Sequence, residues 1–468
     1  MYMKKLGTIL LVITLLAGCQ NVEEQPTGTV TGQNIIAQNI DADRAYETVM
    51  ELTKEKYNGR LAGTEENLMA AEYIAAEFES AGLESPEGIT EYFQYYDQKN
   101  IVMNTGSEFE FMTVSGDVES ALTAHVDVRD MVRFPGTMAS GERIGEMVHV
   151  TDLKQFNDHP EALAGKILLI NHEIYDPNNP GRLLNKAMKL SPKPAGIFIH
   201  RDNRYNEYFL VSKYIPDNML VSEFDNTSGP GVFYLTAEGF MKCIDALREG
   251  KLLKYSTDYT YENYSVPNVI GYLPATIEKS EGTLMFSAHF DHVGTNGDGS
   301  YNPGALDNAS GVAAIIELAR VIEDSLDDRA YNFVFVAFNG EEESLLGASH
   351  YVSDPVFPLD STTLVNFDMV GSSRERALNI NVNNFAMGDT QEELIEMASE
   401  LGLPAHKDFG GASDNIPFEL NGVDAVLLIH MDLTDIHTRL DTADNVDPES
   451  LKDVLNLVVH WLNVYKID

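Results

Sequence analysis

Side chains that can bind metal ions recur just after short apolar runs in the C-terminal half of the chain. Runs at 284–288, 333–338, 364–367 and 425–429 each lead into a His, Asp or Glu, and a further Asp opens a helical pattern between the first two. All are oxygen or nitrogen donors, a set that suits zinc or another divalent transition metal in an open catalytic site. The residues are His289, Asp291, Asp307, Glu341, Glu342, Asp368 and His437.

The number of possible ligands favours two metal ions over one. Even without Asp291 and Glu341, whose other roles are given below, five ligands remain, more than the three protein ligands that usually hold one catalytic zinc. Two ions about 3.5–4 Å apart can instead share a bridging carboxylate and a bridging water. Asp307 stands at a strand-to-helix junction and is the natural bridge. The sequence therefore predicts a two-metal site that could activate water.

The adjacent Glu341 and Glu342 can divide two tasks between them. On an irregular turn their side chains point in different directions, so one can bind metal while the other faces the metal-bridged water. A carboxylate in that place can act as a general base: it takes the proton as water attacks a carbonyl, then gives it to the leaving amine. Asp291, two residues after His289, can orient the imidazole of that histidine.

The apolar runs alternate with helical segments, which is typical of buried strands in a mainly parallel sheet. Residues 312–322 have the three-four spacing of a helix with one buried face, and 391–401 and 448–465 supply two more helices. Ligands of such sheets bind at the carboxyl ends of the strands, where the polar residues stand. We predict an α/β fold with a mainly parallel or mixed central sheet sandwiched by helices.

A length of 468 residues is too great for one ordinary core. Residues 106–255 have short alternating strands, frequent turns and no metal-ligand spacing, so we interpret them as an inserted β-rich domain. The metal-binding domain then comprises 41–105 and 256–468. Before it, residues 1–18 have the charged start, short apolar core and small final residues of a secretory signal, and the polar segment 19–40 is a flexible tether.

The end of that signal, Leu16-Ala17-Gly18-Cys19, resembles the bacterial lipoprotein signal. The resemblance implies cleavage before Cys19 and lipid attachment to it, and thus an exported protein anchored to a bacterial membrane; an ordinary signal peptide with an incidental cysteine is the alternative. Cys243 is the only other cysteine, so a lipidated chain has no internal disulfide. The formal net charge of -41 argues against nucleic acid as a partner.

Six motifs, in order along the chain, resemble those of the co-catalytic di-zinc aminopeptidase family. This family, in the MH clan of metallopeptidases, includes bacterial leucyl aminopeptidases, aminopeptidase Y and glutamate carboxypeptidases. The resemblance implies that His289 and Asp368 bind one Zn²⁺, that Glu342 and His437 bind the other, and that Asp307 binds both. Glu341 would then be the general base, with Asp291 behind His289. The motifs are GRLAGT, HFDH, DNASG, NGEEESLLGA, NFDMVG and HTRLDTADNV, and the insert resembles a protease-associated domain through GKILLIN and PAGIFIH.

The resemblance implies an exported zinc-dependent exopeptidase, with peptides as substrates and an aminopeptidase activity on N-terminal residues. A carboxypeptidase or dipeptidase on the same metal core is the alternative. The complete ligand set counts against a one-zinc glutaminyl cyclase, and Glu341 counts against a non-catalytic peptide-binding lipoprotein. Ile436 precedes His437 where many relatives have a tyrosine that helps to stabilise the tetrahedral intermediate, so the oxyanion-stabilising residue stays open.

Overall fold

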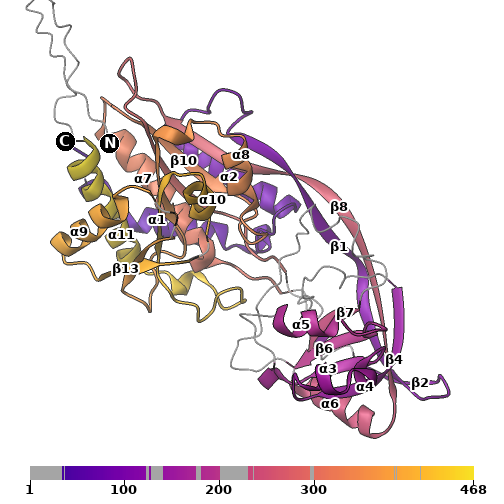
Figure 1. Cartoon of the computed structure of the whole chain (residues 1–468). Helices are drawn as coiled ribbons and strands as arrows, with labels where there is room; N and C mark the ends of the chain where they lie inside the picture. Colours follow the sequence, from indigo (N-terminus) through magenta and orange to yellow (C-terminus); the bar gives the residue numbers. More distant parts are fainter. Residues whose placement is uncertain are drawn as a thin grey trace, which may run out of the picture.

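The computed structural model describes most of the chain from residue 34 onward (Figure 1). The signal segment, Cys19 and most of the predicted tether lie outside the described residues. Among the residues that are described, no helix combines the length and apolar character that crossing a membrane requires. The described residues are 34–35, 37–122, 126–127, 141–174, 181–200, 230–235, 237–295, 300–383, 385, 387–411 and 413–467.

The larger body of the molecule is built on a mixed sheet whose centre is parallel. Strands β9 (Thr283–His289), β10 (Asn332–Phe338), β11 (Thr362–Phe367) and β14 (Asp424–Ile429) run parallel in the order β14-β11-β9-β10. β12 (Leu378–Val382) pairs antiparallel with β14 and parallel with β13 (Ala405–Phe409). The four central strands are apolar on both faces, as a sheet covered on both sides requires.

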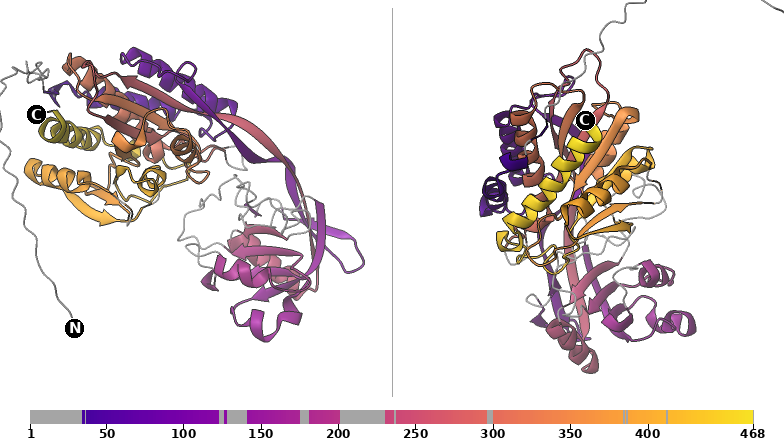
Figure 2. Two further views of the ribbon diagram at one scale, coloured as in Figure 1. Left: turned by 45° about the horizontal axis from the view of Figure 1, so that its top comes forward. Right: turned by 90° about the vertical axis from the view of Figure 1, so that its left-hand side faces the viewer.

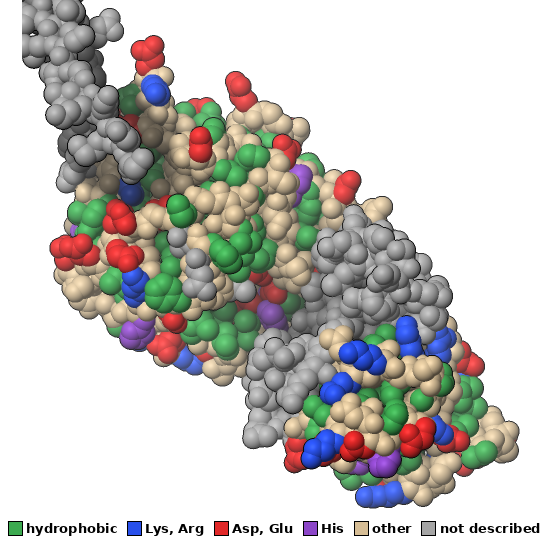
Figure 3. All heavy atoms as spheres, in the orientation of Figure 1, with side chains coloured by type: hydrophobic (Ala, Val, Ile, Leu, Met, Phe, Trp, Pro, Cys, Tyr) green, Lys and Arg blue, Asp and Glu red, His purple; other side chains and the backbone are tan. Residues whose placement is uncertain are grey.

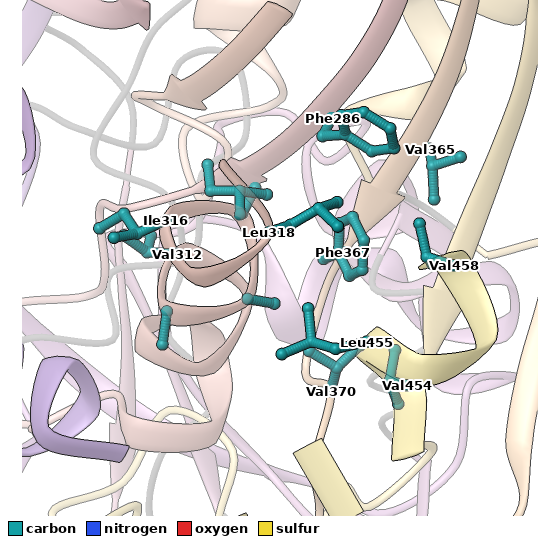
Figure 4. Close-up of a cluster of buried hydrophobic side chains, with 14 of the residues drawn as sticks. Phe286, Val312, Ile316, Leu318, Val365, Phe367, Val370, Val454, Leu455 and Val458 are labelled. Carbon is teal, nitrogen blue, oxygen red and sulfur yellow. The ribbon is translucent and has the colours of Figure 1, made fainter. Parts of the chain in front are cut away.

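Helices cover both faces of this sheet, which confirms the predicted α/β fold. One face packs against α1 (Ala42–Leu52), α2 (Glu65–Ser80), α7 (Ser310–Ser325), α9 (Thr390–Leu401) and α11 (Pro448–Leu462). The other packs against α8 (Leu346–Ser353) and α10 (Asn415–Leu420). Figure 4 shows Val312, Ile316 and Leu318 of α7 and Val454 of α11 in one cluster with Phe286 of β9. This core keeps the strand ends rigid.

Local sequence signals explain where the first two helices begin. The Asp41 side chain accepts a hydrogen bond from the backbone N–H of Arg44 at 3.0 Å, and that of Thr64 accepts one from Asn67 at 3.2 Å. Both are N-caps that satisfy an otherwise free N–H in the first turn. Between the two helices lies the GRLAGT segment, in which Arg60 donates a hydrogen bond to the carbonyl oxygen of Phe290, just after β9, at 2.7 Å.

Two long antiparallel strands, β1 (Phe93–Met112) and β8 (Leu252–Leu273), run from the larger body into the insert (Figures 1 and 2). β8 pairs with β10 at one end and with β4 (Gly141–Val150) at the other. The described strands thereby join into one hydrogen-bonded sheet of 14 strands. The predicted domain junctions, at 105/106 and 255/256, fall inside these two continuous strands.

The insert has its own parallel sheet and its own cores. Its strands β4, β5 (Ile167–Ile170), β6 (Gly196–His200) and β7 (Gly231–Leu235) are parallel, and β3 (Val126–Asp127) pairs antiparallel with β7. One face packs on α6 (Ala237–Arg248) and the other on α5 (Gly181–Ala187). The described part of the insert also contains β2 (Val118–Ala121), α3 (Gln155–Asp158) and α4 (Pro160–Leu163).

Candidate metal centre

The parallel strands bring the predicted ligands to one edge of the sheet. His289 is the last residue of β9. Glu341 and Glu342 follow β10, Asp368 follows β11, and His437 lies in the loop after β14. The register pairs His289 with Phe338, the last residue of β10, so these ends are level. Asp307 comes from the irregular turn η5 (Ala305–Ala309), which leads into α7.

The two carboxylate oxygens of Asp307 face two different groups of donors. Its Oδ1 lies 3.3 Å from Nε2 of His289, which is in turn 3.5 Å from Oδ1 of Asp368. Its Oδ2 lies 3.1 Å from Nε2 of His437, which is also 3.1 Å from Oε2 of Glu342. Asp307 therefore stands between two donor groups, as a carboxylate bridging two cations must.

The chemistry of these donors fits two divalent metal ions. His289, Glu341 and Asp368 offer atoms within 4.8 Å of one another, and so do His292, Asp307 and Glu342. Oδ1 of Asp368 is buried and has no hydrogen-bond partner within the described part of the chain. Carboxylates gathered in this way repel one another unless cations lie between them, and imidazole with carboxylate is a donor set of catalytic zinc.

The electrostatics of the site lead to the same interpretation. Burial by itself would lower the pKa of His289 and of His437, but the neighbouring carboxylates raise both well above the usual value. Burial would raise the pKa of Asp307, yet its hydrogen bonds with these two histidines hold it well below the usual value. The site thus stabilises positive charge, which a metal ion can supply in place of the protons.

Glu341 behaves differently from its neighbour Glu342. Burial, reinforced by the charges of Glu342 and Asp368, raises the pKa of Glu341 well above its usual value. Burial would also raise the pKa of Glu342, but His437 and a hydrogen bond with His292 lower it to about 2. The two adjacent carboxyl groups therefore differ as the predicted division between a proton acceptor and a metal ligand requires.

Asp291 supports both parts of this centre. Its carboxylate oxygens accept the backbone N–H groups of Glu341 and Glu342, each at 3.2 Å. Nδ1 of His289 lies 3.2 Å from the main-chain carbonyl oxygen of Asp291 and 3.7 Å from its carboxylate. Asp291 thus orients His289 mainly through its backbone, while its side chain holds the turn that carries the glutamates.

Three further residues, which the prediction did not include among the site residues, shape the centre. Asp441 accepts the backbone N–H groups of Leu306 and Asp307, each at 3.0 Å, and so fixes the bridging residue. The fully buried Arg60 donates four hydrogen bonds to main-chain carbonyl oxygens around the site. His292 contacts Glu342 directly, with its Nδ1 3.1 Å from Oε1 of the carboxylate. Arg60 lies in the GRLAGT motif and Asp441 in the HTRLDTADNV motif. Their places in these motifs were the sequence signal that could have identified them.

Ile436, by contrast, contributes no polar group. It is partly buried, and its side chain packs against the main hydrophobic core. An isoleucine side chain has no hydrogen-bond donor, so it cannot stabilise an oxyanion in the way a tyrosine can.

The sequence of this region matches a known family of peptidases. Residues 268–462 match the model of Peptidase family M28. This segment is similar to the members of that family. Aminopeptidase YwaD of Bacillus subtilis (strain 168) is 31% identical over 212 residues, which is 42% of this chain and 44% of YwaD. A probable zinc metalloprotease of Pyrenophora tritici-repentis is 29% identical over 235 residues, 46% of this chain and 52% of the relative. The chain thus spans about half the length of these curated relatives.

Solved structures share the fold over about nine tenths of the chain. A zinc aminopeptidase from Bacillus subtilis, BSAP, superposes with a TM-score of 0.65 at 22% identity and covers 90% of this chain and 94% of its own. An aminopeptidase from Aneurinibacillus sp. strain AM-1 gives a TM-score of 0.62 at 21% identity, and the match covers 91% of this chain and 94% of that aminopeptidase. These structures confirm the predicted α/β architecture. The predicted family relationship is confirmed by the family match and by the alignment with YwaD, and the matched segment contains every predicted metal ligand.

Proposed function

We propose that this chain is a two-zinc aminopeptidase that removes N-terminal residues from peptides. The observation that supports this most directly is the position of Asp307, whose two oxygens face separate donor groups. His289 and Asp368 would hold one Zn²⁺, Glu342 and His437 the other, and Asp307 both. When bound, zinc would supply Lewis acidity and lower the pKa of water.

Glu341 transfers the proton of the attacking water. It accepts this proton as the water attacks the carbonyl and passes it to the leaving amine. Burial raises the pKa of Glu341 well above its usual value, and a raised pKa makes a carboxylate a stronger proton acceptor. Asp291 holds the backbone of Glu341 and Glu342, and so keeps the base at a constant distance from the substrate.

Action at the N-terminus is supported by the charge of the site. Acidic and histidine side chains are seen together on the larger body at the side that faces the insert (Figure 3). We infer that carboxylates in this place, beyond those that bind the ions, favour the free α-ammonium group of a peptide over the α-carboxylate. The names of YwaD and BSAP, both aminopeptidases, agree with this preference.

The test is a panel of peptides with paired free and N-acetylated ends, incubated with the zinc-loaded protein. We expect stepwise loss of N-terminal residues from the free peptides and no cleavage of the acetylated ones. Loss of C-terminal residues irrespective of acetylation would replace the proposal with the carboxypeptidase alternative. A Glu341→Gln variant prepared in parallel controls for contaminating peptidases.

We also propose that the protein is exported and anchored to a bacterial membrane through lipid on Cys19. The support is the sequence before this residue, Leu16-Ala17-Gly18, after a short apolar segment. The wild-type chain is expected to incorporate labelled palmitate and to sediment with membranes, and a Cys19→Ser variant to do neither. Equal labelling of both proteins would contradict this proposal without affecting the peptidase assignment.

A further inference from the structure

A second histidine lies against the metal ligand Glu342. Nδ1 of His292 is 3.1 Å from Oε1 of Glu342, whereas Oε2 of Glu342 lies 3.1 Å from Nε2 of His437. The two oxygens of this carboxylate therefore have different neighbours: one faces the ring of His292, and the other faces the predicted ligands of the second ion.

Packing leaves the ring of His292 little freedom to move. The side chain is fully buried, and Gly304, with a φ of +63°, lies directly against it. A Cβ at Gly304 would come within 2.6 Å of Cγ and Cδ2 of the ring. The backbone N–H of His292 donates to the carbonyl oxygen of Arg60 at 3.2 Å, and Nη2 of Arg60 donates to that of Gly304 at 2.8 Å. The chain is thus fixed on both sides of the imidazole.

Hydrogen-bond chemistry determines the direction of the contact. A carboxylate that binds metal is deprotonated and can only accept, so Nδ1 of His292 must carry the proton. Nε2 of His292 is buried and has no partner among the residues that the structure describes. The contact with Glu342 is therefore the polar interaction that orients this ring.

We propose that His292 is a positioning residue: its Nδ1–H holds Oε1 of Glu342 and thereby directs Oε2 toward the second metal position. The inference rests on the proposed two-zinc site and adds a function for a residue that is not one of its ligands. Hydrogen-bond partners of metal ligands typically change metal affinity by about tenfold to hundredfold. The effect is expected mainly for the ion held by Glu342 and His437, because the oxygen of Asp307 nearest to His292 is Oδ2, at 3.6 Å, which is the oxygen that faces His437.

The experiment measures zinc binding to the full chain by competition with a chelator, which does not depend on peptidase activity. His292→Leu removes the hydrogen-bond donor. It is expected to lower the zinc affinity of one of the two sites by about tenfold to hundredfold and to leave the affinity of the other site unchanged. His292→Asn is the matched control, because its amide N–H₂ can replace Nδ1–H, and its affinities should stay close to those of the wild type.

Each other outcome contradicts the proposal. Wild-type affinities in His292→Leu would exclude any role in metal binding. An equal loss of zinc affinity at both sites, with an unchanged far-UV circular dichroism spectrum, would indicate a general effect on the loops. If His292→Asn were as weak as His292→Leu, the imidazole would itself be a ligand, which its 3.6 Å distance from Oδ2 of Asp307 would also allow. A wild-type protein that binds no zinc would instead refute the proposed function.

Discussion

Replacing Arg60 with methionine tests whether a buried guanidinium holds the loops of the metal centre. Its four hydrogen bonds, of 2.7–2.8 Å, reach the carbonyl oxygens of Phe290, Leu52, Pro303 and Gly304. At about 1.5 kcal/mol or more for each bond from a charged donor, they contribute at least about 6 kcal/mol. Burial lowers the pKa of Arg60 from 12.5 to about 10, a cost of about 3 kcal/mol. The net loss in Arg60→Met is therefore expected to be about 3 kcal/mol or more.

The single tryptophan of the chain makes this measurable in the correct domain. Trp461 is buried in α11 and donates to Glu393 at 2.8 Å, so its fluorescence follows unfolding of the metal-binding domain and not of the insert. Urea unfolding of the metal-free protein should show a lower free energy of unfolding in Arg60→Met. Arg60→Lys keeps the charge but cannot reach all four oxygens, so an intermediate value is expected. A free energy of unfolding in Arg60→Met within about 1 kcal/mol of the wild type would refute the reasoning.

Three further predictions follow from the same structure. Glu341→Gln should retain both zinc ions and lose about two to four orders of magnitude in turnover; retained activity would show that another group is the base. Asp307→Ala should lower the zinc content, and two ions at full occupancy would disprove its bridging position. Burial lowers the pKa of His430 from 6.5 to about 4, so the unfolded chain binds this proton first as the pH falls. The free energy of unfolding should therefore decrease between about pH 6.5 and pH 4, by up to about 3 kcal/mol. His430→Asn, which can still accept the N–H of Gly371, should lack this decrease in urea titrations at several pH values; an unchanged profile would contradict it.

The sequence alone predicted where the candidate ligands meet because these residues are tied to regular elements. His289 ends one buried strand and Asp368 follows another, and the carboxyl ends of parallel strands lie at one edge of a sheet. The adjacency of Glu341 and Glu342 likewise predicts that one carboxylate binds metal while the other acts as a base. The signal segment and Cys19, outside the described residues, remain predictions from the sequence.

Only the tertiary structure decided how the ligands are held. Arg60 is 230 residues from Phe290 in the chain, and the hydrogen bond between them ends on a main-chain oxygen, which any residue type offers. The contact of His292 with Glu342 depends on the ring lying against Gly304, and Asp441 acts on the backbone of Asp307. The periodicity of a strand depends on residue types and can therefore be recognised in a sequence. Hydrogen bonds to the backbone across the fold depend on packing, and they become visible only when the loops are in place.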